Sequence, residues 1–349
     1  MRETRRIQLT GGGSYVISLP KDWVRLHGLG KGDVVVIVRE ADGSLRVMPP
    51  SRGRGVGGEK AVLRVPRGAR FEAVVRRIIS YYMAGVDVIK VVFPEAIDTG
   101  LARRIRSFIN SRLIGVEVVE ESASSITVQS IVNDTALPLS ASLRRLIGIV
   151  KSMLTDISTA LEESSKPLLE EIVSRDDLAD KFYLYVSRQV MKLLRGLVTP
   201  GELGVGSLAE ASLYASAAKI LERMADHASS IADSLAAIAS AGGDPLPDCI
   251  RGVYMQHYSS VLKLYREAAR VFSGQDTPDT DKVIAVAEEL RRQGRRVYAE
   301  ASCIDDIGVL EKTLKALEST RRLIDYTIDL MEVLLNMSVV RSLAGRRTG

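Results

Sequence analysis

Apolar residues from about Leu137 onward recur at intervals of three and four, the spacing that places side chains on one face of an α-helix. Segments rich in Gly and Pro interrupt this pattern at 199–201, 242–245 and 274–278. Leu, Ile, Ala and Met fill most of the apolar positions, which is typical of helices that pack into a bundle. The pattern predicts six helices, over residues 138–166, 168–197, 206–241, 247–273, 279–302 and 305–343.

The first fifty residues follow a different pattern, with short runs in which apolar and polar residues alternate. Two β-runs flank a glycine-rich turn at 10–13, a short helix follows Pro20, and a second hairpin turns at Asp42-Gly43. The predicted order is therefore hairpin, short helix, hairpin. A unit of this size with so few apolar side chains is only marginally stable alone, so we expect it to dimerise.

Residues 61–132 alternate between strand-like and helix-like patterns in the order β-α-β-α-β-β, which predicts a small α/β domain. Pro, Gly, Ser and Arg dominate residues 49–60 without an apolar period, as in a linker. The expected domains are 1–50, 61–133 and 134–343, with 51–60 as the linker. Arginines at exposed positions of the two middle-domain helices are expected to be solvated: Arg76, Arg77, Arg103, Arg104 and Arg106.

Positive charge is concentrated at one end of the chain. The 349 residues include 48 basic and 43 acidic ones, a net charge of +5. Residues 1–58 alone hold ten basic and five acidic residues, an excess equal to that of the whole chain. A basic end on a neutral body favours a polyanionic partner there. A basic surface that serves only solubility is the alternative.

The two cysteines, Cys249 and Cys303, stand far apart and form no CxxC motif. We expect no disulfide, as in a protein of the reducing cytosol. The N-terminus lacks the apolar core of a signal peptide, and no apolar run approaches the ~20 residues of a membrane span. The composition therefore predicts a soluble, cytoplasmic protein without membrane insertion.

Carboxylates recur on one face of the third predicted bundle helix. Glu222 and Asp226 are one helical turn apart, and Asp233 continues the line. Asp176 and Asp180, with Asp177 beside them, have the same spacing on the preceding helix. If the two helices pack side by side, the carboxylate oxygens form a cage of the kind that hard cations prefer. A solvated acidic helix face is the alternative, and His227 alone is more typical of a surface or capping residue than of a ligand.

The third and sixth predicted helices correspond when the sequence is shifted by 99 residues. Asp226 then falls on Asp325, His227 on Tyr326, and Asp233 on Glu332. The correspondence predicts a duplicated three-helix unit.

The N-terminal segment resembles the AbrB/SpoVT family of swapped-hairpin DNA-binding domains. The glycine-rich first turn, "SYVISLPKDWVRLHGLGKGD" and "DGSLRVMP" carry the resemblance. It implies an interlocked homodimer whose basic side chains lie against DNA, and an alternative in which the unit only dimerises the chain stays open. The candidate DNA contacts, by position and residue type, are Arg2, Arg5, Arg6, Lys21 and Arg25.

The segments "LERMADHASSIAD" and "SRDDLADKFYLYVSRQ" resemble the PhoU family of phosphate-uptake regulators, over about residues 137–343. The resemblance implies two tandem three-helix bundles and metal-binding acidic motifs. It implies a divalent or ferric ion (Mg, Mn, Fe or Zn) in the first repeat. The ligand positions carried over from the family are Glu222 and Asp226, faced by Asp176, Asp177 and Asp180, with Asp233 as a weaker addition.

The second repeat departs from the family pattern. Arg321 stands where an acid is expected, and the partner helix, "AEELRRQGRRVYAE", is basic. Arg321, Arg291 or Arg292 is expected to pair with Asp325 in place of a metal.

The expected fold class is a multidomain α+β protein: a small swapped-hairpin domain, a small α/β domain and tandem three-helix bundles. Together these imply a DNA-binding transcriptional regulator of phosphate uptake, with DNA, a second copy, and a phosphate ABC transporter or phosphate-signalling protein as partners. The alternative is a cytosolic adaptor that negatively regulates such a transporter by direct contact. Because no Ser/His/Asp or Cys/His set accompanies the acids, we do not expect an enzyme.

Overall fold

The computed structural model describes residues 3–39, 43–49, 58–240, 244–272 and 279–345. The chain divides into two compact units, Met1–Gly57 and Gly58–Gly349, and each is described by itself. Arg2 and residues 51–57 of the expected linker lie outside the described residues. None of the helices in the described ranges has the length and apolar character needed to cross a bilayer.

The N-terminal unit contains two hairpins and a short helix, in the order that the sequence predicts. Its elements are β1 (Gln8–Thr10), β2 (Ser14–Val16), α1 (Lys21–Leu26), β3 (Val36–Arg39) and β4 (Leu45–Met48). β1 pairs antiparallel with β2, and β3 with β4. The first turn requires glycine, because Gly12 and Gly13 have φ values of 101° and 92°.

This unit buries little of its apolar surface. Helix α1 has no buried residue. Leu9 of β1, Tyr15 of β2 and Leu26 of α1 are 66%, 77% and 80% exposed. Apolar burial is the main favourable term in folding, and the described residues of this unit form no apolar core of their own within the chain.

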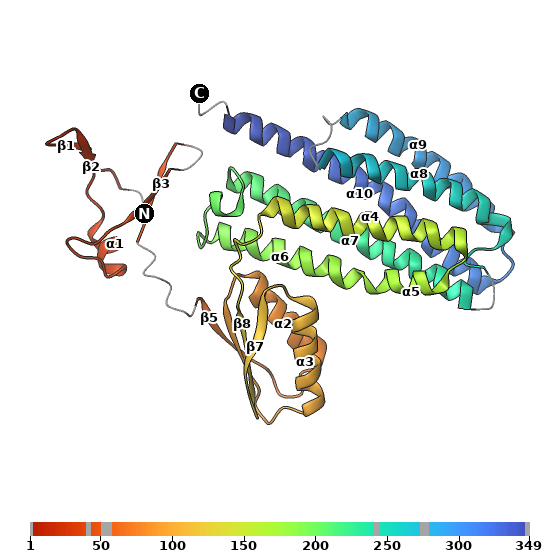
Figure 1. The fold of residues 1–349 in the computed structure, drawn as a ribbon, viewed down its shortest axis with the longest axis horizontal. Coiled ribbons are helices and arrows are strands. Elements are labelled where there is room, and N and C mark those ends of the chain that lie inside the picture. Colours follow the sequence, from red (N-terminus) through yellow and green to blue (C-terminus); the bar gives the residue numbers. More distant parts are fainter. Residues whose placement is uncertain (1–2, 40–42, 50–57, 241–243, 273–278, 346–349) are drawn as a thin grey trace. The chain divides into compact units, whose positions relative to one another are not determined.

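The second unit begins with a four-stranded sheet covered by two helices on one face (Figure 1). The elements follow the predicted order: β5 (Lys60–Arg64), α2 (Phe71–Met83), β6 (Val88–Val92), α3 (Thr99–Arg112), β7 (Val116–Ser122) and β8 (Ser125–Ser130). The strand order is β5-β6-β8-β7, with β5 parallel to β6 and the other neighbours antiparallel. Ile78 and Tyr82 of α2 and Ile105 of α3 are fully buried in its core.

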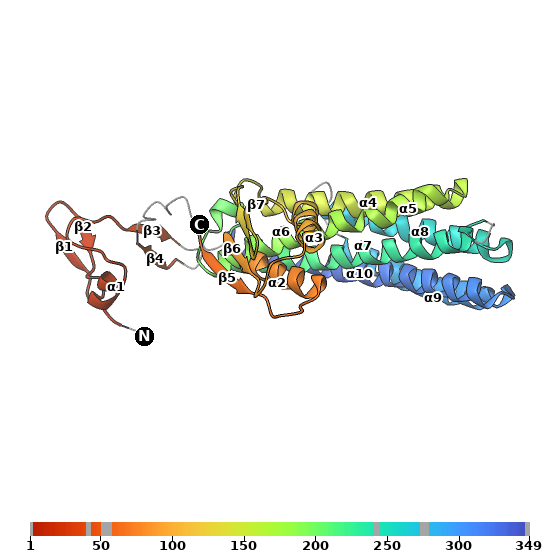
Figure 2. The ribbon, with the colours of Figure 1, turned by 90° about the horizontal axis from the view of Figure 1, so that it is seen from below.

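The rest of the second unit is a bundle of long helices that run beside one another (Figure 2). They are α4 (Leu139–Glu163), α5 (Lys166–Ser174), α6 (Asp176–Leu194), α7 (Leu208–Ser240), α8 (Asp248–Phe272), α9 (Thr280–Glu300) and α10 (Ile307–Gly345). Their apolar faces share one core, which includes Tyr254, Tyr258 and Tyr265. The fold is thus the expected multidomain α+β class.

The predicted single helix over 168–197 is wrong, because the chain forms two helices that meet at Arg175. The Arg175 guanidinium pairs with Asp156 of α4 and with Glu171 of α5. These pairs hold the junction of α5 and α6 against α4. The dihedral angles of Arg175 stay helical and no Gly or Pro marks the break, so the apolar period did not reveal it.

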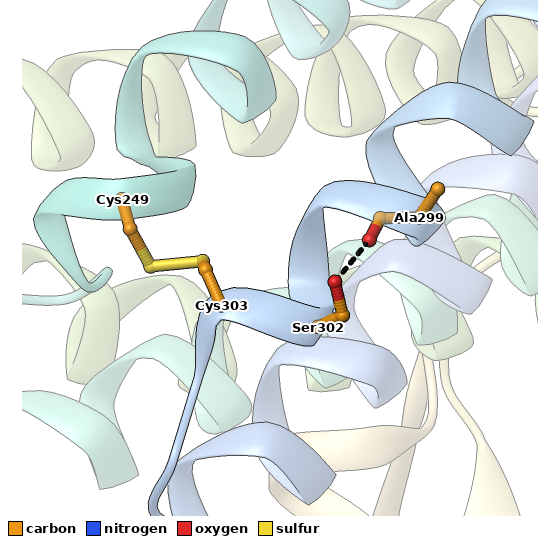
Figure 3. Close-up of a disulfide and its surroundings, with 4 residues drawn as sticks. All are labelled: Cys249, Ala299, Ser302 and Cys303. Carbon is orange, nitrogen blue, oxygen red and sulfur yellow. Dashed lines mark hydrogen bonds between the residues drawn. A yellow bond between two sulfur atoms is a disulfide. The ribbon is translucent and has the colours of Figure 1, made fainter.

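The expectation of two free thiols is also wrong. Cys249, at the start of α8, and Cys303, in the short 3-10 helix Ala301–Cys303 after α9, form a disulfide (Figure 3). Their Cα atoms are 6.3 Å apart, within the range of bridged cysteines. Fifty-four residues separate them in sequence, so motif spacing could not predict the bridge. The argument for a reducing compartment, which rested on free thiols, therefore does not hold.

A buried ionic network joins the α/β domain to α6. The Arg188 guanidinium of α6 is fully buried and donates from Nε to Asp134 at 2.7 Å and from Nη2 to Asp87 at 2.7 Å. Its Nη1 donates to the carbonyl oxygens of Tyr82 and Val86 at 2.9 and 2.7 Å. Lys192, one turn further along α6, pairs with the same two aspartates. The network fixes the α/β domain to α6, the helix that carries Asp176, Asp177 and Asp180.

Candidate metal centre

Three carboxylates converge between α6 and α7. Asp180 projects from α6, and Glu222 and Asp226 project from successive turns of α7. One oxygen from each lies within 4.8 Å of the other two. Glu222 is buried, Asp180 is half-buried and Asp226 is exposed, so the cluster opens to solvent on one side. The three residues hereafter form the acidic cluster.

Crowding and burial disfavour the charged forms of Asp226 and Asp180. Desolvation raises the pKa of Asp226 to about 6, and the charges on Glu222 and Asp180 add to this shift. Desolvation likewise raises the pKa of Asp180, although the Arg112 guanidinium opposes it. A bound cation would remove this repulsion, because it favours the deprotonated carboxylates.

Asp176 lies close to the cluster without belonging to it. Its pKa is raised to about 7 by desolvation and by the charges on Asp226 and Asp180. Its Oδ1 is buried and has no hydrogen-bond partner among the described residues. A buried carboxylate oxygen without a partner is costly, so Asp176 is a neighbouring acid whose oxygen a cation would stabilise.

The other expected acids point elsewhere. Asp177 pairs with Arg112 of α3, and Asp233 pairs with Lys315 of α10 at 3.3 Å. His227 Nδ1 lies 3.3 Å from the Ser319 hydroxyl, so the imidazole faces α10 and not the cluster.

Two protein cations already contact the cluster. Lys219 Nζ lies 2.6 Å from both oxygens of Glu222. Arg112 Nη1 donates to Asp180 Oδ2 at 2.8 Å. Among the described residues, no basic side chain pairs with either oxygen of Asp226, with Oδ1 of Asp180 or with Oδ1 of Asp176. This all-oxygen donor set suits a hard cation such as Mg²⁺ or Mn²⁺. The residues therefore fit a metal, provided that Lys219 gives way at Glu222.

The corresponding place in the second repeat is filled by arginine. Arg291 of α9 donates to Asp325 Oδ1 from Nη2 at 2.6 Å, and Arg321 of α10 donates to Asp325 Oδ2 from Nη1 at 2.8 Å. This confirms the expected pairing for Arg291 and Arg321. Arg292 pairs with Glu289 instead. Guanidinium groups thus occupy the position where the first repeat gathers acids.

The N-terminal basic residues are exposed where the structure describes them. Arg5, Arg6, Lys21 and Arg25 are all exposed, and Arg5 pairs with Glu3. Arg2 lies outside the described residues. Their exposure leaves the charges free to meet a polyanion.

Sequence reasoning missed two arginines that connect α6 to the α/β domain. Arg112 bridges Asp177 and Asp180 from a helix sixty-eight positions away, and no sequence signal predicts such a long-range contact. Arg188 was detectable in principle, because it lies within the largely apolar segment "FYLYVSRQVMKLL", where a buried charge must find a partner.

Comparisons with known proteins support both resemblances. Residues 143–235 match the family model described as "PhoU domain". Residues 8–55 match "Antidote-toxin recognition MazE, bacterial antitoxin". A comparison with curated proteins gave no match.

Two solved structures are similar to the helical part. The phosphate transport system regulatory protein PhoU from Streptococcus pneumoniae aligns with a TM-score of 0.47 and 17% identity, over 57% of this chain and 93% of that one. PhoU from Pseudomonas aeruginosa aligns with a TM-score of 0.48 and 19% identity, over 58% of this chain and 96% of that one.

Proposed function

Because the chain carries a PhoU domain and an N-terminal MazE/AbrB-like domain, we propose that it is a cytoplasmic, DNA-binding transcriptional regulator of phosphate uptake. The observation that carries this proposal is the fusion of a basic, coreless hairpin unit to a PhoU-type bundle. The helical part registers phosphate status through a metal or a partner, and the N-terminal unit binds the DNA.

The N-terminal unit supports a dimer as the DNA-binding species. Exposed Leu9, Tyr15 and Leu26 give it an apolar surface that a second copy can cover. Five more basic than acidic residues lie in positions 1–58, so an interlocked pair presents twice this excess to the phosphate backbone. Arg5, Arg6, Lys21 and Arg25, with Arg2, are the proposed contacts.

The first repeat is the proposed metal site. Asp180, Glu222 and Asp226 hold the ion, with Asp176 as the fourth oxygen donor; Asp177 stays with Arg112. When bound, the ion supplies positive charge that neutralises the carboxylates and ties α6 to α7. Mg²⁺, Mn²⁺ or iron fits this oxygen-only set better than Zn²⁺, which favours nitrogen and sulfur ligands.

Asp180 links the metal site to the α/β domain. Its Oδ2 accepts from Arg112 of α3, so an ion that draws Asp180 inward weakens this contact. Arg112 retains its pair with Asp177. A ligand shifts a conformational equilibrium only through its different affinity for the two states, and the shared carboxylate provides such a difference.

The experiment that tests the function has two parts. Genome-wide DNA occupancy in cells grown at high and low phosphate should locate the protein at phosphate-transport genes and change with phosphate. With purified protein, the logarithm of DNA affinity should fall by about 0.9 per decade of salt for each phosphate neutralised. Replacing Arg5 and Arg6 with Ala should reduce that slope. Failure to bind duplex DNA at low ionic strength would refute the proposal and leave a unit that only dimerises.

A further inference from the structure

A pocket opens in the second repeat between α9 and α10, beside α8. Its empty volume is about 300 Å³, including the part open to solvent. Its polar and small lining residues are His257, Arg291, Gly294, Arg295, Tyr298 and Arg321. Leucines and Ile324 form the remaining walls. The pocket is on the opposite repeat from the acidic cluster and shares no residue with it.

The charged side chains that line the pocket are all positive. Three arginines line the pocket, and none of its described lining residues carries a carboxylate. Asp325 and Glu318, which accept hydrogen bonds from lining residues, are paired with guanidinium groups: Asp325 with Arg291 and Arg321, and Glu318 with Arg321 and Arg322. Positive charge in a partly enclosed site attracts an anion more strongly than it would in bulk water.

Arg295 is the cation that remains available. It is exposed, and it makes no hydrogen bond or ion pair within the part of the chain that the structure describes. Arg291 also has nitrogen donors to spare, because only its Nε and Nη2 bond to Asp325. A guanidinium offers donors in the planar arrangement that suits phosphate oxygens.

A buried histidine with an unpaired nitrogen lines the same pocket. His257 of α8 is 6% exposed, yet its Nδ1 has no partner among the described residues. Burying a polar atom without a partner is costly. Nδ1 is itself buried, so a ligand in the pocket would reach the other ring nitrogen, Nε2, which faces Gly294.

Gly294 keeps the space in front of this histidine open. A Cβ at this position would lie 3.3 Å from His257 Nε2 and 3.5 Å from Cε1. Glycine in the interior of a helix is destabilising relative to alanine. The basic stretch of α9 thus contains a small residue at the point where a side chain would crowd the imidazole.

We propose that this pocket is a binding site for a small phosphate oxyanion, with Arg295, Arg291 and His257 as its contacts. Burial lowers the pKa of His257, so the imidazole is neutral near pH 7 and can accept a hydrogen bond from a protonated phosphate oxygen. Sulfate carries no such proton, so phosphate is the preferred ligand. The proposal goes beyond the function proposed above and does not depend on DNA binding or on a metal.

Isothermal titration of the full-length protein with inorganic phosphate tests the site. The protein is first treated with a chelator and dialysed into chloride buffer, so that phosphate cannot bind through a metal in the acidic cluster. We expect one site per chain, with weaker binding of sulfate. A parallel titration with glycerol phosphate compares a phosphomonoester with free phosphate. The ligand that binds more tightly identifies the preferred source of the phosphate group, and either result supports the pocket.

The variants assign the binding to these residues. Arg295→Gln removes one charged contact and should weaken phosphate binding about tenfold, as loss of a charge-assisted hydrogen bond does. Gly294→Ala should weaken it by crowding the pocket, and circular dichroism checks that this variant is folded. Arg296→Gln is the matched control, because Arg296 is exposed on the same helix and does not line the pocket. Absence of phosphate binding, equal binding of sulfate, or binding unchanged in both Arg295→Gln and Gly294→Ala would overturn the proposal.

Discussion

The rings of His227 and Tyr326 lie against each other, with centroids 5.6 Å apart and planes inclined by 31°. These two residues coincide when the chain is shifted by 99 positions. A residue can contact its own equivalent only close to the axis that relates the two copies. The contact lies where α7 packs against α10, the two helices that the predicted duplication makes equivalent, and the duplication itself stays a prediction.

Replacing His227 with Tyr, the residue of the second repeat, should reduce the pH dependence of stability. Desolvation and nearby arginines lower the pKa of His227 in the folded state below its usual value of 6.5. The unfolded chain therefore binds the proton more readily, and His227 lowers the stability as pH falls below about 6.5. Thermal unfolding at pH 5 and pH 7.5 measures this effect. Wild type should lose more stability than His227→Tyr between these two pH values, and an equal loss would contradict the prediction.

Asp226→Asn should have opposite effects on the metal-free and metal-loaded protein. Without metal, the substitution removes repulsion within the acidic cluster and should raise stability by roughly 0.5 kcal/mol, the size of a like-charge pair one turn apart. With Mn²⁺ present, it removes a ligand and should abolish the thermal shift that the ion produces. Asp233→Asn is the control, because Asp233 is outside the cluster and pairs with Lys315. Equal Mn²⁺-induced shifts in wild type and Asp226→Asn would exclude the cluster as the metal site.

Much of the bundle could be predicted because burial imposes a period on the sequence. Helix α7, for example, was expected over 206–241 and spans Leu208–Ser240. The β-α-β-α-β-β order of the middle domain was predicted for the same reason, since strands and helices bury side chains at different periods. The break between α5 and α6 at Arg175 was not, because no Gly or Pro marks it in the sequence.

The candidate site was predictable only within single helices. Spacing placed Glu222 and Asp226 on one face of a helix, and the convergence of Asp180 with them depended on the packing of α6 against α7. Two features were beyond any spacing rule: Asp177 turns toward Arg112 of α3, and Cys249 meets Cys303 through the path of α8 and α9. Both depend on long-range packing that no local pattern records.

Arg188→Met should destabilise the second unit by about 3–5 kcal/mol, as expected when one member of a buried ionic group is removed. The substitution leaves Asp134, which is 6% exposed, with Lys192 as its remaining cation. The carbonyl oxygens of Tyr82 and Val86 also lose their donor. Denaturant unfolding measures the change.

Arg195→Met is the matched control for this network. Arg195 follows α6 and pairs with Glu59 of the α/β domain near the surface, where ion pairs contribute at most about 1 kcal/mol. A loss in Arg188→Met no larger than in Arg195→Met would show that the buried network does not hold the domain to α6.

The disulfide should stabilise the second repeat. A cross-link between residues 54 positions apart lowers the entropy of the unfolded chain. In the chain-entropy model this stabilises the folded state by about 4 kcal/mol at 25 °C. Cys249→Ser with Cys303→Ser should therefore lower the unfolding temperature. Dithiothreitol should lower that of wild type by the same amount and leave the double variant unchanged, because only the bridge is reducible. Mass spectrometry after alkylation without reductant should find both cysteines unmodified in wild type. Alkylation of both residues, or a reductant effect in the double variant, would contradict the bridge as the source of the stability.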